Sequence, residues 1–241
     1  MRSGNPVLSP KTFSIDRTAA GNTMTIQGTV NKTLLSLLIV VGAASLTWGR
    51  VIENSVGLIM LGGFGGFIVA LVTVFKKEWA PVTTPIYCAL EGLLLGGISF
   101  LYERQFPGIV INAVSLTFGT LFGLLMAYKS GMIQVTQNFR LGVVAATLGI
   151  GVLYLVNFVM MFFGANIGFV HESGWLGIGF SLFVVVIAAL NLVLDFDFIE
   201  KGAQQGAPKY MEWYGAFGLM VTLIWLYLEL LRLLAKLNRR R

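Results

Sequence analysis

Acidic residues in apolar stretches are the residues of this chain most able to do chemistry. Asp195 and Asp197 lie at the end of the apolar segment LNLVLDFDFIE, and Glu229 lies inside LIWLYLELLRLL. A third segment, YCALEGLLLGG, contains Glu91. Because a carboxylate within a lipid bilayer is costly, an acid in such a position predicts a functional site.

The two acids deepest in the last two apolar segments are the strongest candidates. Asp195 and Asp197 point about 200° apart on a helix, so they cannot both face one partner. We expect Asp195 to face the interior and Asp197, with Glu200, to face the headgroups. Two carboxyls in one site do not readily ionise together, so an Asp195–Glu229 pair would share a proton and respond to pH. Their oxygens are also the hard ligands that Ca²⁺ takes.

Other partners for these acids stay open at this point. Arg232 follows Glu229 by three residues and could form a local ion pair with it. Glu229 lies roughly 24 Å along the axis of its helix, a depth that Asp195 matches only if its own helix continues well past Glu200 or if the last helix starts deep. Glu212, near the start of the last segment, is therefore an alternative partner for Asp195. Glu91 has no basic residue within a helical turn and needs a partner, water or a proton.

Composition identifies the class of protein. The 241 residues are 56% hydrophobic and 12% charged, with a mean hydropathy of +0.80, whereas soluble domains are roughly 25% charged. This indicates an integral membrane protein whose first partner is the lipid bilayer. The net charge of +6 lies in tails and short loops, which does not suggest nucleic-acid binding. A single cysteine, Cys88, and a single histidine, His171, provide neither an internal disulfide nor a zinc site, and we expect no cofactor.

Long apolar runs predict the elements that position the acids. A membrane span needs about 20 apolar residues, and the sequence contains seven such runs, at residues 33–48, 56–75, 84–102, 109–128, 141–163, 175–194 and 213–237. The runs are continuous rather than alternating, so they predict helices and not strands. The expected fold is an all-α membrane protein with a polar, flexible tail (1–32), a seven-helix transmembrane domain (33–237) and a basic tail (238–241).

Glycines four residues apart occur in three consecutive spans. Small residues at this spacing let helix backbones approach closely in lipid. We therefore expect tight helix packing at three pairs, Gly62 with Gly66, Gly92 with Gly96, and Gly119 with Gly123.

Basic residues predict the orientation. With a cytoplasmic N-terminus, ten Lys and Arg residues before the last helix lie in inner segments and two lie in outer loops, which favours this orientation by the positive-inside rule. Seven full spans, which we favour, then put the basic C-terminal tail outside, whereas a short or re-entrant last helix would return it inside. The short loops and the lack of organelle signals indicate a bacterial inner membrane, and no cleavable signal peptide precedes the first span.

The segments ALEGLLLGGIS, LDFDFIEKG and LYLELLRLL together resemble the Bax inhibitor-1 family of seven-span membrane proteins. The resemblance implies six helices packed around a central, hydrophobic seventh helix. It also implies a pH-sensitive Ca²⁺ leak governed by acids in the last two spans. Carried over by motif, these acids are Asp195 and Glu229, which would also be transient Ca²⁺ ligands. The second acid is Glu where the family usually has Asp.

Three functions follow from these residues. The first is a pH-sensitive Ca²⁺ leak channel or exchanger that is gated by protons and is not an enzyme. An intramembrane aspartyl protease also needs two embedded acids, but the G-x-G-D pattern of such enzymes is missing. The alternative is a non-transporting regulator that binds and restrains a partner membrane protein or protease. The sequence leaves open whether the protein is a monomer or a homo-oligomer.

Overall fold

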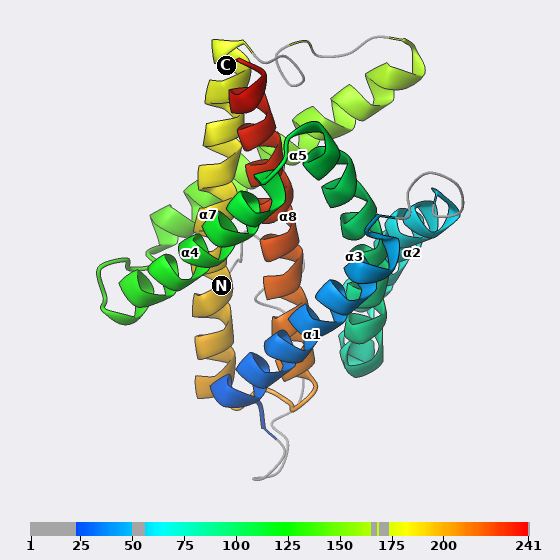
Figure 1. Cartoon of the computed structure of the whole chain (residues 1–241). Helices are drawn as coiled ribbons and strands as arrows, with labels where there is room; N and C mark the ends of the chain where they lie inside the picture. The colour runs from blue at the N-terminus through cyan, green and yellow to red at the C-terminus, as the bar shows by residue number, and fades with distance from the viewer. Residues whose placement is uncertain (1–22, 50–55, 165–167, 169–173, 241) are drawn as a thin grey trace. The chain divides into compact units, whose positions relative to one another are not determined.

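The computed structural model describes residues 23–49, 56–164, 168 and 174–240. Within these residues are seven helices long and apolar enough to cross a membrane, and no β-strand. The helices are α1 (Ile26–Thr47), α2 (Val56–Phe75), α3 (Ala80–Gln105), α4 (Ile109–Lys129), α5 (Gln137–Phe162), α7 (Trp175–Gln204) and α8 (Met211–Arg239), with a short 3-10 helix, η2 (Lys77–Trp79), before α3 (Figure 1). The expectation of an all-α membrane protein with seven spans is confirmed.

Two helices extend furthest beyond the apolar runs that predicted them. α1 begins at Ile26 rather than at residue 33, because Thr25 caps it: the Thr25 hydroxyl accepts a hydrogen bond from Gly28 N at 2.9 Å. Most of the expected polar tail, residues 1–22, lies outside the described residues. α7 continues to Gln204, ten residues (204 − 194) past its expected end. Asp195 therefore lies inside a helix rather than at its end.

The chain divides into two compact units. The α4–α5 unit comprises Gly108–Phe196 and Thr222–Arg241, and so contains α4, α5, most of α7 and the C-terminal part of α8. The α1–α3 unit comprises Val7–Pro107 and Asp197–Val221, and so contains α1, α2, α3 and the connected ends of α7 and α8. The candidate residues divide between the two units, and each unit is described by itself.

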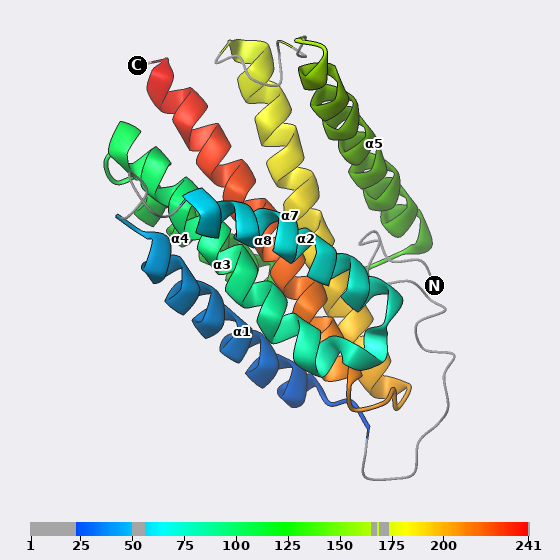
Figure 2. The same cartoon turned by 90° about the vertical axis from the view of Figure 1, so that its right-hand side faces the viewer.

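In the α1–α3 unit, α3 packs against both α1 and α2 (Figure 2). Glycines make these contacts close: a Cβ placed on Gly62 would lie 2.5 Å from the Leu90 carbonyl oxygen, and one on Gly92 would lie 2.5 Å from the Val40 carbonyl oxygen. The packing expected for the glycine pairs of α2 and α3 is thus confirmed.

The third glycine pair behaves differently. A Cβ on Gly119 or Gly123 of α4 would meet nothing within 4 Å. The expectation that this pair packs tightly is wrong for the described structure. A glycine pair removes side chains from one face of a helix, but it does not determine whether another helix covers that face.

A tight turn joins α7 to α8. Gly206 has a φ of +67°, Ala207 N donates to Gly202 O at 3.0 Å, and Gly206 N donates to Ala203 O at 3.2 Å. These two bonds form a Schellman motif, in which a glycine in the left-handed conformation ends a helix. Pro208 follows and has no N–H to continue α7. The turn makes α7 and α8 antiparallel neighbours. α8 has the most buried apolar window of the seven, at 61%, while its expected central place among six other helices stays a prediction.

Replacing Gly96 by Ala tests the packing of α3. The added Cβ would overlap the Ala44 carbonyl oxygen of α1, so we expect the free energy of unfolding to fall by about 2 kcal/mol. Gly119→Ala is the matched control, because its Cβ meets nothing. Thermal unfolding of the purified protein in detergent measures both. Equal melting temperatures for the two variants would contradict the close α1–α3 contact.

Candidate functional site

Glu229 is held in a closed triangle of hydrogen bonds within the α4–α5 unit. Its side chain is buried, with 1% of the residue exposed. Tyr154 Oη donates to Glu229 Oε1 at 2.9 Å, and Arg232 Nη1 donates to Oε1 at 2.8 Å and to Oε2 at 3.0 Å. Arg232 Nη1 also donates to Tyr154 Oη at 2.7 Å. The carboxylate is therefore bound by one charged and one neutral donor, and Tyr154 links α5 to α8.

Apolar side chains lie beside this triangle, in which Glu229 is buried and the Arg232 side chain is 37% exposed. Glu229 and Arg232 are three residues apart and share a face of α8, and the guanidinium carbon lies 5.3 Å from the centre of the Tyr154 ring. Tyr154 packs edge-on against Phe180 and borders a buried apolar cluster that includes Ile150. Electrostatic interactions are stronger in such surroundings than in water. The sequence did not single out Tyr154, whose only signal is a polar tip inside the apolar run GVLYLVNF.

Asp195 lies in a second polar group of the same unit. It is fully buried and accepts a hydrogen bond from Thr222 Oγ1 at 2.6 Å. One helical turn earlier, Asn191 Nδ2 donates to Thr147 Oγ1 at 2.8 Å and to Ile187 O at 2.8 Å. The group thus combines side chains from α5, α7 and α8. Asn191 could have been noticed in the sequence, because NLVLD places an amide and an acid four residues apart in an apolar run.

The two principal acids lie along the same side of α8 at different levels, Asp195 through its contact with Thr222 and Glu229 as a residue of α8 itself. Thr222, which binds Asp195, precedes Glu229 by seven residues, or about two helical turns and 10 Å of rise. The continuation of α7 past its expected end brings Asp195 to the level of Thr222. Each acid has hydrogen-bond partners of its own, and the sharing of one proton between them stays a prediction.

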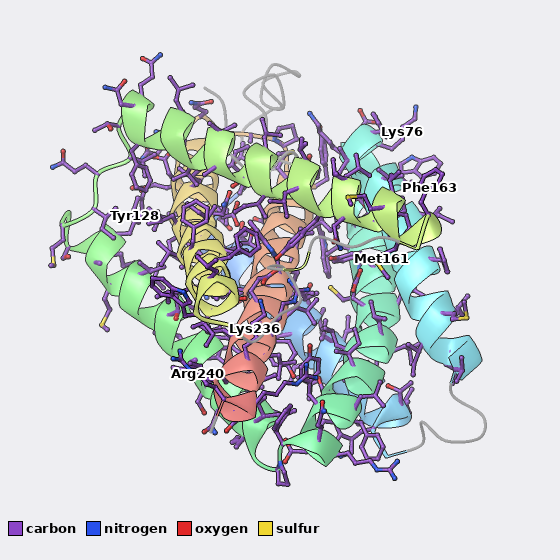
Figure 3. All side chains as sticks on the ribbon, turned by 90° about the horizontal axis from the view of Figure 1, so that it is seen from above. Lys76, Tyr128, Met161, Phe163, Lys236 and Arg240 are labelled. Carbon is purple, nitrogen blue, oxygen red and sulfur yellow. The ribbon has the colours of Figure 1, made fainter. Side chains whose placement is uncertain are left out.

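Lys236 follows Glu229 by another seven residues and so lies on the same side of α8. It is 4% exposed and donates from Nζ to the Gly177 carbonyl oxygen of α7 at 3.0 Å; Figure 3 labels it on α8. Thr222, Glu229 and Lys236 therefore form one stripe along α8, which we call the α8 polar line. Polar groups at successive depths in apolar helices are candidates for a functional site.

Glu212 belongs to the α1–α3 unit and has different partners. It is fully buried, and its carboxylate forms ion pairs with Lys32 Nζ and, at 2.9 Å, with Lys209 Nζ. The Thr25 backbone N–H and hydroxyl donate to Oε1 at 2.9 and 2.8 Å. A Cβ on Gly28 would overlap this carboxylate, so the glycine makes room for it. These contacts fasten the start of α1 to the start of α8, and Thr25, Lys32 and Gly28 were not predicted.

The remaining acids are less buried or locally paired. Asp197 was expected to face the headgroups, but it is only 7% exposed and its Oδ1 lies 2.6 Å from Lys201 Nζ. α7 continues past both residues, which places them on one helix face. Glu91 is half-buried, and its Oε1 would lie 2.9 Å from a Cβ on Gly66. No hydrogen bond or ion pair joins Glu91 to another residue that the structure describes.

No group of three or more His, Cys, Asp or Glu side chains is positioned to hold a metal in the described part of the chain. Any cation would meet a single carboxylate together with neutral oxygens, as at Asp195 and Thr222.

Comparison with known families gives one extensive match. The family described as "Bax inhibitor 1 like" matches residues 5–239, nearly the whole chain. No curated protein shows a significant sequence match. The family match agrees with the resemblance that the motifs around the acids indicate.

Replacing Arg232 by Gln tests the triangle. The variant leaves the Glu229 carboxylate buried without its charged donor, so we expect the free energy of unfolding to fall by about 2 kcal/mol. The double variant Arg232→Gln, Glu229→Gln removes the charge as well and should recover at least half of this loss. Thermal unfolding at neutral pH measures both. A double variant no more stable than the single one would show that the ion pair does not determine the effect.

Replacing Glu212 by Gln tests the connection between α1 and α8. We expect the free energy of unfolding to fall by about 2 kcal/mol, because two lysines lose their shared carboxylate. Gly28→Ala should act in the same direction, since its Cβ displaces the carboxylate. Glu78→Gln, at an exposed position of η2, is the control. Unfolding midpoints that match the control would rule out a structural role for Glu212.

Proposed function

Because the chain belongs to the Bax inhibitor 1 like family, we propose that it is a proton-regulated leak pathway or exchanger for a hard cation such as Ca²⁺. The observation that carries the proposal is the α8 polar line, where buried Asp195 of α7 contacts one level of a helix face and buried Glu229 of α8 lies at another. Buried carboxylates in membrane spans occur mainly along pathways for ions or protons.

Glu229 is the proton-sensitive gate in this proposal. When ionised, it binds Arg232 and Tyr154 and so ties α5 to α8. Hydrogen bonds to an ionised acceptor are roughly twice as strong as those between neutral groups. Protonation of Glu229 removes the charge and weakens its bonds to both partners. The hydrogen bond from Arg232 to Tyr154 then remains as the only side of the triangle that still ties α5 to α8 at full strength, so α5 moves more easily relative to α8. The leak therefore opens as the pH falls.

Asp195 attracts the cation in this proposal. Its carboxylate is a hard oxygen ligand of the type that Ca²⁺ takes, and affinity for Ca²⁺ rises with the number of charged ligands. A single carboxylate gives weak binding, which suits an ion that must leave as readily as it enters. Ca²⁺ is thus the transported ion, and protons are the regulatory ligand.

The protein is a multi-pass membrane protein. We place its N-terminus in the cytoplasm and the chain in a bacterial inner membrane. The support is the excess of ten inner over two outer basic residues before the last helix. In this orientation the α1–α3 unit has Lys32 and Lys209 at the cytoplasmic end of its helices.

Ca²⁺ flux into proteoliposomes tests the proposal. With the wild-type protein, we expect flux to increase as the pH falls from about 8 to about 5, as a proton-regulated leak requires. Glu229→Gln imitates the protonated acid, so its flux should be high and independent of pH. Asp195→Asn should lower flux about tenfold at every pH, because the cation loses its charged ligand.

Glu78→Gln, which changes an exposed acid, is the control and should retain wild-type flux and pH dependence. Wild-type flux equal to that of empty vesicles over the whole pH range would overturn the leak. A non-transporting regulator would then be the better description of the protein.

A further inference from the structure

Asn191 has a buried oxygen without a partner. The residue is 1% exposed, and its Oδ1 accepts no hydrogen bond from any residue that the structure describes. Buried carbonyl oxygens are nearly always satisfied in folded proteins, so an unsatisfied one calls for an explanation. The requirement is stricter within a membrane, where lipid offers no donor.

The orientation of the Asn191 amide is determined by its neighbours. The Ile187 carbonyl oxygen can only accept, so the amide nitrogen must face it, at 2.8 Å. The same nitrogen donates to Thr147 Oγ1 at 2.8 Å. Exchanging the amide nitrogen and oxygen would place two oxygens against each other. The unpartnered Oδ1 therefore belongs to the oxygen side of a fixed amide.

Asp195 and Thr222 lie next to this amide along the helices. Asp195 follows Asn191 by four residues, a spacing that puts two side chains on one helix face about 5–6 Å apart at Cβ. Thr222 Oγ1 donates its hydrogen to Asp195 Oδ2 at 2.6 Å, which leaves the hydroxyl lone pairs available to a cation. A carboxylate and a hydroxyl are thus in contact, and an amide carbonyl lies one helical turn away on the same face of α7, with all three residues buried.

We propose that Asn191 Oδ1, the Asp195 carboxylate and Thr222 Oγ1 together form a transit binding site for a small hard cation. The inference rests on the proposed leak function and identifies the oxygen ligands of its permeating ion. Carboxylate, amide carbonyl and hydroxyl oxygens replace water around ions such as Ca²⁺. The unpartnered carbonyl oxygen then has a physical role, because a cation satisfies it whenever one passes.

Thr147 is a positioning residue for this site. Its hydroxyl accepts from the Asn191 amide nitrogen and so directs Oδ1 away from α5. The Thr147→Val variant keeps the Asn191 oxygen but lets the amide rotate. It should weaken cation binding less than loss of the oxygen does.

The test measures two properties of the full-length protein over a range of Ca²⁺ concentrations at one fixed pH. The first is the Ca²⁺ concentration that gives half-maximal flux in proteoliposomes. The second is the rise in melting temperature with added Ca²⁺ in detergent, which follows from binding to the folded state alone. We expect Asn191→Leu to raise the half-maximal concentration about tenfold, and Thr147→Val about threefold, as expected for losing and for loosening one ligand.

Ser181→Ala is the matched control. Ser181 lies on the same helix, is equally buried, and has a hydroxyl without a partner among the described residues. Its variant should match the wild type in both measurements. If Asn191→Leu does not fold, Thr147→Val and Asn191→Asp take its place, and the added charge of Asn191→Asp should lower the half-maximal concentration.

The outcomes distinguish this site from the leak itself. Wild-type flux together with an unchanged Ca²⁺ dependence in the Asn191 and Thr147 variants would overturn the site and leave the leak standing. No flux in the wild type, with a Ca²⁺-dependent melting temperature that the Asn191 variants alter, would overturn the leak and support cation binding. Variants that only lower the melting temperature, equally with and without Ca²⁺, would show that Asn191 is structural.

Discussion

A charge buried among apolar helices must be matched by an opposite charge or by hydrogen bonds, and α8 carries more than one such charge. The partners that other parts of the chain supply differ between its buried acids. α1 and the α7–α8 turn supply the lysines for Glu212, while α5 supplies the tyrosine for Glu229. The need to satisfy these acids therefore restrains both ends of α8, within each unit separately.

The surroundings of an acid decide what it can do. Glu212 has two lysines and two donors from Thr25, so the loss of one contact leaves others in place, as suits a structural connection. Glu229 has one charged donor on its own helix and one hydroxyl from α5. The binding of one proton would therefore weaken most of the contacts that hold Glu229, but a smaller share of the contacts that hold Glu212.

Apolar length and turn chemistry made most of the fold predictable. Continuous apolar runs of about 20 residues have few alternatives to membrane helices, and six of the seven helices match runs recognised from the sequence at their starts to within a few residues. Hydropathy failed where polar residues continue a helix. It missed the capped first turns of α1 and the last turns of α7, which hydrogen bonds and packing stabilise rather than apolar length. The glycine pair of α4 shows the same limit, because spacing describes one helix and packing requires two.

The sequence by itself determined the membrane class, the seven spans, the family and the acids that need explanation, because each depends on composition or on residues close together in the chain. Only the tertiary structure decided their partners. Tyr154 is 75 residues from Glu229, and Lys32 is 180 residues from Glu212. The role proposed for Asn191 depends on its hydrogen bond to Thr147, which orients its amide. A hydrogen bond depends on the position of both atoms to within a fraction of an ångström, and folding brings such atoms together without any regular spacing in the sequence.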